Sequence, residues 1–426
     1  MRVEVQAAGP LRGELRLPSD KSLTHRAFML AAAARSSSEV LHPLTGADCL
    51  STLQCLNAMG LRHRADGPVW TLLPVNEWMA PQRPLDCGNS GTTMRLLSGL
   101  LASRPMEATL VGDASLSRRP MKRIAEPLRL MGATVEGDTA PLRISGRDLV
   151  GIEYTLPVAS AQIKSCVLLA GLRASTPTTV HEPHPSRDHT ERMLTALGVQ
   201  IQRVSPLTSK LEPFQVFEGF RMKIPADISS AAFWMVAGAL IPGSEIRLTE
   251  VGTNPTRTGI LEVLQQAGAQ VEHEPGPEEL GEPTGDLIVR SSKDLRPFTI
   301  SGDLVPRLID EIPVLAVLAT QCHGETVIRD AGELRVKESD RIQVVADGLR
   351  NMGAQVETTG DGMVISGPTP LTGTAIDAEG DHRIAMAFSI AGMIATGSTT
   401  IEHADSVLTS YPTFFEDMKS LQGVPR

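Results

Sequence analysis

Six short polar segments in this sequence each precede an apolar run and could bind anions. They share Ser, Asp, Asn, Gln, Lys or Arg side chains at the expected start of a helix. The segments are SDKSLTHR at 19–26, DCGNSGTTMR at 86–95, ASAQIKS at 159–165, ADISS at 226–230, PRLIDEIP at 306–313 and GDHRIAM at 380–386. A helix N-terminus presents free backbone N–H groups and a partial positive charge, so it attracts anions. Several converging helix starts could hold more than one phosphate or carboxylate.

The spacing of basic and hydroxyl side chains strengthens this prediction. Ser22 and Arg26 lie four residues apart, as do Lys337 and Arg341, so each pair shares one helix face. A dense basic run occupies residues 118–123. Ser and Asp are also ordinary helix caps, and basic runs usually face solvent, so no single segment is decisive. Their recurrence at matched positions favours anion binding.

Two acidic residues lie among these basic groups. Glu338 is flanked by Lys337 and Arg341, and Asp310 directly precedes an apolar helical segment. Carboxylates in such surroundings can exchange protons with a bound substrate. Taken alone, Glu338 is better explained as a first-turn glutamate that the helix dipole favours.

A repeated pattern of helix, glycine and strand predicts how these segments are positioned. Five apolar helical segments end in a glycine and are followed by a short alternating strand. The glycines are Gly60, Gly132, Gly198, Gly268 and Gly353, about 70 residues apart. Glycine after the last helical turn suits a left-handed cap that leads into a strand. Six such units would fill the chain.

A second type of helix is rich in alanine and apolar on nearly all sides. Examples are residues 27–34, 231–240 and 384–396. A helix without a polar face is buried. We therefore expect an α/β fold in which each unit has one buried and one amphipathic helix, with sheets outside.

The composition argues against several classes of protein. The formal net charge is −9 and aromatic residues make up 3% of the chain, so we expect no nucleic-acid partner and no membrane association. The five cysteines form no CxxC pair, which favours a reduced, cytoplasmic protein. No P-loop or dinucleotide fingerprint is present. His181, His184 and His189 could bind a metal, but a loop and helix cap explain this proline-containing segment better.

Eight motifs along essentially the whole chain carry a resemblance to a known family. They are LPSDKSLTHRAFMLAA, DCGNSGTTMRLL, DASLSRRPM, SAQIKS, SRDHTERM, IDEIPVLA, ELRVKESDRI and GDHRIAMAF. In these motifs the chain resembles the EPSP synthases, the 3-phosphoshikimate 1-carboxyvinyltransferases of the enolpyruvyl transferase family.

The resemblance implies a two-lobed α/β fold of six βαβαββ repeats, three in each domain. Residues 1–19 and 225–426 would form domain I, on the phosphoenolpyruvate side. Residues 20–224 would form domain II, on the shikimate 3-phosphate side. The active site would lie in the cleft between the domains, which close around shikimate 3-phosphate before phosphoenolpyruvate binds well.

The resemblance also implies which residues bind and react. The expected shikimate 3-phosphate ligands are Lys21, Ser22, Arg26, Ser160, Ala161, Gln162, Arg187, Asp310 and Lys337. The expected phosphoenolpyruvate ligands are Lys21, Asn89, Gly91, Arg119, Gln162, Arg341 and Arg383. The expected acid–base groups are Lys21, Asp310 and Glu338. No metal and no organic cofactor is implied.

The sequence departs from the family pattern at three of these sites. Ala161 replaces a serine, so a hydroxyl is lost while the backbone amide remains. Ser410 stands where many members have a lysine that contacts phosphoenolpyruvate, and Glu333 stands where many have asparagine. Gly91 leaves room that an alanine would fill, so we expect inhibition by glyphosate, which the absence of the lysine at Ser410 could weaken.

The implied reaction moves the enolpyruvyl group of phosphoenolpyruvate onto the 5-hydroxyl of shikimate 3-phosphate by addition and elimination. We expect a monomer. One alternative is UDP-N-acetylglucosamine 1-carboxyvinyltransferase, which has the same fold and donor. Many of its members carry a cysteine in the loop equivalent to DASLSRRPM, and here that loop has none. The other alternative is an anion-binding repeat protein without catalytic activity.

Overall fold

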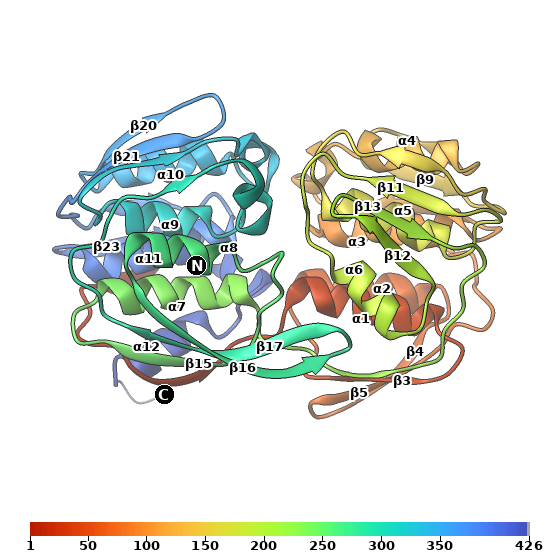
Figure 1. Cartoon of the computed structure of the whole chain (residues 1–426), viewed down its shortest axis with the longest axis horizontal. Coiled ribbons are helices and arrows are strands. Elements are labelled where there is room, and N and C mark those ends of the chain that lie inside the picture. The colour runs from red at the N-terminus through yellow and green to blue at the C-terminus, as the bar shows by residue number, and fades with distance from the viewer. Residues whose placement is uncertain (424–426) are drawn as a thin grey trace. The chain divides into compact units, whose positions relative to one another are not determined.

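The computed structural model describes residues 1–423 of the 426-residue chain. The chain forms two compact units (Figure 1). Unit 1 contains residues 1–18, 225–277 and 283–426, and unit 2 contains residues 19–224 and 278–282. Ser19 and residues 278–282, which the resemblance places in domain I, group with unit 2. Which substrate each unit serves stays a prediction.

Unit 2 is built around three buried helices, α1 (Lys21–Ala33), α3 (Gly91–Ala102) and α5 (Ala161–Gly171). They are apolar nearly all round, as a helix in a core must be. Helix α3 packs closely on α5 at Gly99. A Cβ atom at this glycine would lie only 2.2 Å from the Cys166 carbonyl oxygen, which shows how near the two backbones are. Helices α2 (Ala47–Ala58), α4 (Lys122–Leu130) and α6 (His189–Ala196) each bury one face and expose the other.

Three four-stranded sheets complete unit 2. The first contains β14 (Arg221–Lys223), β3 (Ser38–Leu41), β5 (Val69–Leu73) and β4 (Arg62–Asp66) in that order. The second contains β6 (Leu85–Asp86), β7 (Glu107–Val111), β9 (Leu142–Ser145) and β8 (Thr134–Glu136). The third contains β10 (Glu153–Thr155), β11 (Thr178–His181), β13 (Thr208–Leu211) and β12 (Ile201–Ser205).

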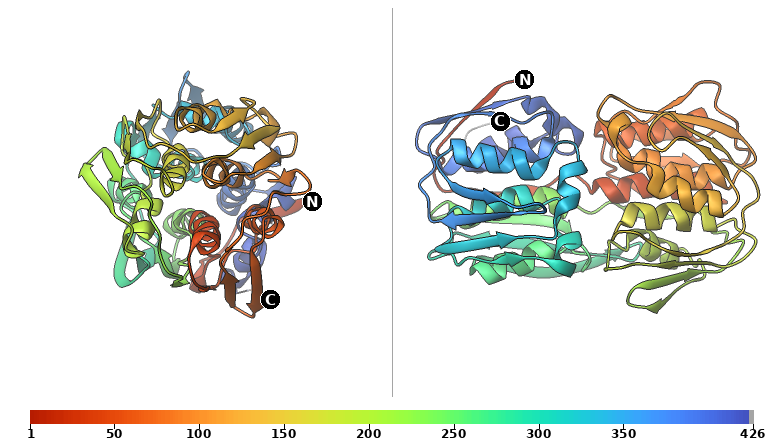
Figure 2. Two further views of the ribbon diagram at one scale, coloured as in Figure 1. Left: turned by 90° about the vertical axis from the view of Figure 1, so that its right-hand side faces the viewer. Right: turned by 90° about the horizontal axis from the view of Figure 1, so that it is seen from above.

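Unit 1 repeats this plan with different helices. Its buried helices are α7 (Ile228–Leu240), α9 (Ile312–Ala319) and α11 (His382–Ile394). Its amphipathic helices are α8 (Gly259–Ala267), α10 (Arg341–Asn351) and α12 (Phe414–Leu421). In both units the sheets lie on the outer side of the buried helices (Figure 2).

The sheets of unit 1 have four, four and three strands. The first contains β16 (Gln270–Glu279), β17 (Glu282–Arg290), β15 (Glu245–Gly252) and β2 (Arg12–Arg16) in that order. The second contains β18 (Thr299–Ile300), β19 (Gly324–Ile328), β21 (Met363–Gly367) and β20 (Gln355–Thr358). The third contains β1 (Val3–Gln6), β23 (Ser398–Glu402) and β22 (Ala375–Asp377).

Strands from distant parts of the chain complete two of the repeats. Each complete repeat pairs its first two strands in parallel, with a helix between them, as β6 and β7 do. Strand β2 pairs in parallel with β15, and β14 pairs in parallel with β3. Each of these pairings joins strands that lie far apart along the chain. Strand β2 belongs to unit 1, and the next element, α1, already belongs to unit 2.

The ends of the helices follow the sequence signals. Gly60, Gly132, Gly198, Gly268 and Gly353 all have positive φ angles, which glycine tolerates better than any other residue. Polar residues cap five of the six buried helices, because the side chains of Asp20, Ser90, Ser160, Asp227 and Asp381 each accept a backbone N–H of the first turn. Within residues 1–423, no helix is long and apolar enough to cross a membrane.

Candidate active site

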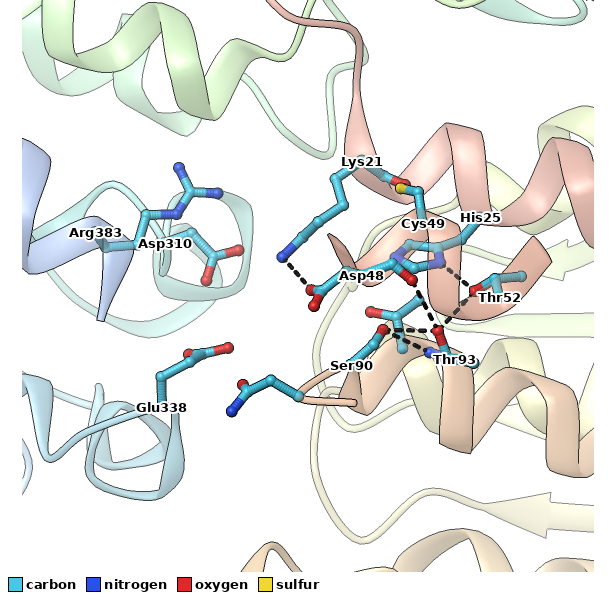
Figure 3. A network of polar contacts seen from close by, with 12 residues as sticks. Lys21, His25, Asp48, Cys49, Thr52, Ser90, Thr93, Asp310, Glu338 and Arg383 are labelled. Atoms are coloured by element: carbon cyan, nitrogen blue, oxygen red, sulfur yellow. Dashed lines mark hydrogen bonds and ion pairs between the residues drawn. The ribbon is translucent and has the colours of Figure 1, made fainter. Parts of the chain in front are cut away.

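At the start of α1, Lys21 is held by a carboxylate from the next helix. The Lys21 Nζ atom lies 2.9 Å from Oδ2 of Asp48, which occupies the first turn of α2 (Figure 3). Both side chains are largely buried, so the contact is shielded from solvent. Asp48 was not among the residues that the sequence predicted, since its contact with Lys21 spans 27 positions.

One turn further along α1, the Arg26 guanidinium is fixed on three sides. It donates to the Thr190 hydroxyl at 2.8 Å, to the Ser165 hydroxyl at 2.8 Å and to the Ser22 carbonyl at 2.9 Å. Burial lowers the pKa of Arg26 to about 10 despite the opposing charge of Glu191. The positive charge of Arg187 lowers it further, so these two predicted ligands lie close enough to repel each other. A phosphate between them would relieve that repulsion.

The start of α3 forms a second basic cluster. Arg119 donates to the side-chain oxygen of Asn89 at 2.6 Å and to its backbone carbonyl at 3.2 Å. The Asn89 amide donates in turn to Asp113 at 2.6 Å. A Cβ atom at Gly91 would lie 3.0 Å from a guanidinium nitrogen of Arg95 and 3.4 Å from one of Arg119. Gly91 therefore lets both guanidinium groups approach the backbone at the start of α3.

The start of α5 is tied to α3 through Gln162. Its side-chain oxygen accepts a hydrogen bond from Arg95, and its amide donates to the Thr92 hydroxyl at 2.9 Å. Ser160 caps α5, and Ala161 is the first residue of that helix. Arg95 lies in the motif DCGNSGTTMRLL, but it is not among the ligands that the motif resemblance implies.

In unit 1, Arg341 joins three carboxylates. It opens α10 and donates to Asp381 at 2.8 and 3.2 Å, to Asp310 at 3.2 Å and to Glu338 at 2.7 Å. Burial lowers the pKa of Arg341, but the three carboxylates outweigh this effect and raise it overall, so the group stays charged. Lys337 approaches the same Asp310 oxygen at 3.4 Å. The two predicted acids, Asp310 and Glu338, thus share one guanidinium.

Arg383 lies beside this cluster at the start of α11. Its backbone N–H donates to the capping Asp381 side chain at 2.9 Å, and its guanidinium donates to the Ser229 carbonyl at 3.1 Å. Asp381 is fully buried and serves both Arg341 and the helix cap. The sequence showed Asp381 only as part of the motif GDHRIAMAF, although it is the main counter-ion of Arg341.

The departures from the family pattern also have defined places. Glu333 lies in the 3-10 helix η3 (Gly332–Val336), which leads to Lys337. Ser410 ends the 3-10 helix η4 (Ala404–Thr409) and is buried, 3% exposed. Serine is short and uncharged, so this buried position lacks the ammonium group of the lysine that many family members have there.

The predicted residues fall into two groups, one in each unit. Unit 2 holds Lys21, Ser22, Arg26, Asn89, Gly91, Arg119, Ser160, Ala161, Gln162 and Arg187. Unit 1 holds Asp310, Lys337, Glu338, Arg341 and Arg383. Each expected substrate set therefore draws on both units. Within each unit, the polar contacts tie most of the named residues into shared clusters at helix starts.

The histidines and cysteines that could be reactive have structural partners or are buried. His181 pairs with Glu153 and Thr208, and His189 pairs with Glu282. Among the residues that the structure describes, no group of three or more His, Cys, Asp or Glu side chains could hold a metal ion. All five cysteines lie within the described residues, are buried and form no disulfide.

Helix starts that carry basic side chains, as in both units, are suited to binding phosphate and carboxylate groups. Residues 5–418 match the EPSP synthase family, the 3-phosphoshikimate 1-carboxyvinyltransferases. Proteins of that name from Bacillus cereus and Geobacillus kaustophilus are each 50% identical, covering 96% of this chain and 97% or 98% of theirs. The EPSP synthase structure from Acinetobacter baumannii superposes with a TM-score of 0.88 at 43% identity, covering 99% of this chain and 98% of its own.

The chain belongs to the EPSP synthase family. The expected fold class, the α/β enolpyruvyl-transferase-like fold, is confirmed. The roles of individual residues stay predictions, because they were carried over by motif.

The pKa values of two histidines are predicted to shift in opposite directions from the usual value. Burial, together with the positive charges of Lys21 and Arg26, lowers the pKa of His25 well below the usual 6.5. The hydrogen bond and charge of Asp377 raise the pKa of the exposed His403 above it. As pH falls, His403 should protonate first and His25 should still be neutral at 6.5. His25 binds a proton more readily in the unfolded chain than in the folded chain, because its pKa is lowered by folding. The free energy of unfolding therefore falls as the pH drops below the usual histidine pKa.

Imidazole nitrogen chemical shifts, followed by NMR across this range, measure both titrations. A His403→Gln variant assigns the exposed signal. Protonation of His25 at or above pH 6.5 would contradict the burial that the structure assigns to it.

Proposed function

We propose that this chain transfers the enolpyruvyl group of phosphoenolpyruvate to the 5-hydroxyl of shikimate 3-phosphate. The products are 5-enolpyruvylshikimate 3-phosphate and phosphate, which places the chain in the shikimate pathway to chorismate and the aromatic amino acids. The match to the EPSP synthase family over residues 5–418 carries this conclusion. The two basic clusters support it, because the two substrates bring two phosphates and two carboxylates together.

For shikimate 3-phosphate, we assign the phosphate to Arg26, Arg187 and the start of α5. Arg26 is held by Thr190 and Ser165, so its guanidinium is oriented before the ligand arrives. Ser22, Ser160, Gln162 and the backbone amide of Ala161 would contribute further hydrogen bonds. Asp310 and Lys337 would contact the hydroxyl groups of the ring.

For phosphoenolpyruvate, we assign Arg119, Arg341 and Arg383 to its carboxylate and phosphate. Arginine suits this role because its planar fork can bind either group through two hydrogen bonds. Asn89 holds Arg119, and Gly91 permits close approach at the helix start. Lys21 and Gln162 complete this set.

The proposed mechanism is addition followed by elimination. Asp310 accepts the proton of the 5-hydroxyl of shikimate 3-phosphate. The oxygen of that hydroxyl forms a bond to C2 of phosphoenolpyruvate. Glu338 delivers a proton to C3, which gives a tetrahedral intermediate with a methyl group. Glu338 then removes a proton from that methyl group while the C2–O bond to phosphate breaks. Lys21 stabilises the departing phosphate, which takes up a proton as it leaves, and Asp310 gives up the proton of the 5-hydroxyl to restore the starting state. The vinyl double bond returns in the product.

We further propose that residues of both units serve one catalytic centre, and that the protein is a cytoplasmic monomer. The five cysteines, none of which forms a disulfide, support a reducing compartment. UDP-N-acetylglucosamine is not favoured as the acceptor. The matched family and the similar proteins are named 3-phosphoshikimate 1-carboxyvinyltransferases, which supports shikimate 3-phosphate instead. A non-catalytic protein would need no acids in contact with Arg341, where Asp310 and Glu338 lie.

The direct test is steady-state release of phosphate from phosphoenolpyruvate with each acceptor in turn. Release with shikimate 3-phosphate, and not with UDP-N-acetylglucosamine, supports the proposal. Release only with the second acceptor would establish the alternative enzyme. Binding of both ligands without release would establish an anion-binding protein.

The variant Asp310→Asn is predicted to bind shikimate 3-phosphate and to turn over slowly. Asparagine keeps the size of the side chain but accepts a proton poorly, so kcat should fall by about two orders of magnitude or more. Calorimetry measures binding, and phosphate release measures kcat. Lys337→Met is the matched control, because it removes the cation next to Asp310 and keeps the carboxylate. Turnover of Asp310→Asn near that of the unmodified chain would exclude Asp310 as the base.

Glyphosate is predicted to compete with phosphoenolpyruvate. The variant Gly91→Ala is predicted to weaken the inhibition by glyphosate. The added methyl group would lie 3.0 Å from the Arg95 guanidinium and 3.4 Å from that of Arg119. The Arg95 guanidinium would have to shift slightly, the contact with Arg119 would be an ordinary one, and the methyl group itself would fill the space next to Gly91. An inhibition titration of both proteins at one fixed phosphoenolpyruvate concentration measures the effect. Equal inhibition constants for the two proteins would show that the inhibitor does not use this space.

A further inference from the structure

A chain of buried hydrogen bonds connects the first three helices of unit 2. His25 Nδ1 lies 2.7 Å from the Thr52 hydroxyl, which lies 2.6 Å from the Thr93 hydroxyl (Figure 3). The Thr93 hydroxyl lies 2.8 Å from the Ser90 hydroxyl and 3.3 Å from the Asp48 carbonyl oxygen. The chain thus begins on α1, crosses α2 and ends at the cap of α3.

The four side chains of this hydrogen-bond chain are completely buried. His25, Thr52, Ser90 and Thr93 are each 0% exposed. His25 is neutral near pH 7, because burial and two neighbouring cations lower its pKa. Each hydroxyl has one proton to donate, so loss of any hydroxyl interrupts the chain whichever way the protons point. A buried polar chain costs desolvation energy and gains more in defined geometry than in stability.

Each end of this chain lies next to a candidate ligand. Lys21 is one helical turn before His25 on α1, and its Nζ atom contacts Asp48, whose carbonyl oxygen faces Thr93. Ser90 lies between Asn89 and Gly91, and its side chain accepts the Thr93 backbone N–H at 3.1 Å. The chain therefore joins the lysine at the start of α1 to the backbone that faces Arg119.

The shikimate 3-phosphate ligands of unit 2 are held differently. Arg26 is anchored to α5 and α6 through Ser165 and Thr190, and none of its hydrogen bonds passes through Thr52 or Thr93. Lys21 is an expected ligand of both substrates, but Arg26 is held independently of the chain. Loss of the chain should therefore disturb the phosphoenolpyruvate subsite more than the shikimate 3-phosphate subsite.

We propose that His25, Thr52 and Thr93 are positioning residues that hold Lys21 and the Asn89–Gly91 segment at the separation that phosphoenolpyruvate requires. They do not touch the substrate, since all three are fully buried. They act through Asp48 and the Ser90 cap. This inference rests on the proposed function, because it concerns binding of phosphoenolpyruvate.

The test compares Thr93→Val with Thr93→Ser. Valine keeps the shape of threonine and removes the hydroxyl, whereas serine keeps the hydroxyl. We expect Thr93→Val to raise KM for phosphoenolpyruvate about tenfold, which corresponds to one lost buried hydrogen bond and its unsatisfied partners. KM for shikimate 3-phosphate should change less than about twofold, because Arg26 keeps its partners. Thr93→Ser should restore both values.

Three outcomes would overturn the inference. One is a fall in kcat with both KM values unchanged, which a purely structural role would produce by lowering the active fraction. The others are equal increases in both KM values and identical behaviour of Thr93→Val and Thr93→Ser. If Thr93→Val does not fold, Thr52→Val carries the same test with Thr52→Ser as its control, because the Ser90 cap bond stays intact.

Failure of the proposed function gives a different result. In that case the unmodified chain releases no phosphate from phosphoenolpyruvate with shikimate 3-phosphate. An active unmodified chain whose Thr93→Val variant shows no selective change in KM for phosphoenolpyruvate would overturn only the positioning role.

Discussion

The pairing of buried guanidinium and ammonium groups with carboxylates is the interaction on which the rest of the structure depends. An enzyme that joins two substrates, each with a phosphate and a carboxylate, needs several cations close together, and unpaired buried cations are costly. Arg341 meets this requirement through Asp381, Asp310 and Glu338, and Lys21 meets it through Asp48. The net charge of −9 shows that these positive regions are local.

Helix starts supply the geometry for these pairs. Asp381 caps α11 and also binds Arg341 at the start of α10, so one carboxylate fixes two helices and one candidate ligand. Ser90 caps α3 and belongs to the buried chain that leads back to His25. Each of these two buried residues both caps a helix and holds a candidate ligand or the backbone beside one, which links the stability of the fold to the placement of the site.

Local patterns in the sequence predicted the elements well, because their causes are local. Positive φ angles at Gly60 and Gly353, and burial of 231–240, follow from nearby residues. The pairing of β2 with β15, and of Arg341 with Asp381 over 40 positions, depends on chain folding that periodicity does not encode. Motif resemblance named Lys21 and Asp310 but not Asp48, Arg95 or Asp381, since these residues act by holding others.

The central claim is that the reaction proceeds by addition and elimination, with Glu338 moving a proton at C3 of phosphoenolpyruvate. The most direct measurement is NMR of phosphoenolpyruvate and product recovered from a partly converted reaction in deuterium oxide. We expect deuterium in the vinyl methylene group of both compounds, only when shikimate 3-phosphate is present, and far less of it with Glu338→Gln. Product that forms in deuterium oxide without any deuterium at this carbon would contradict it.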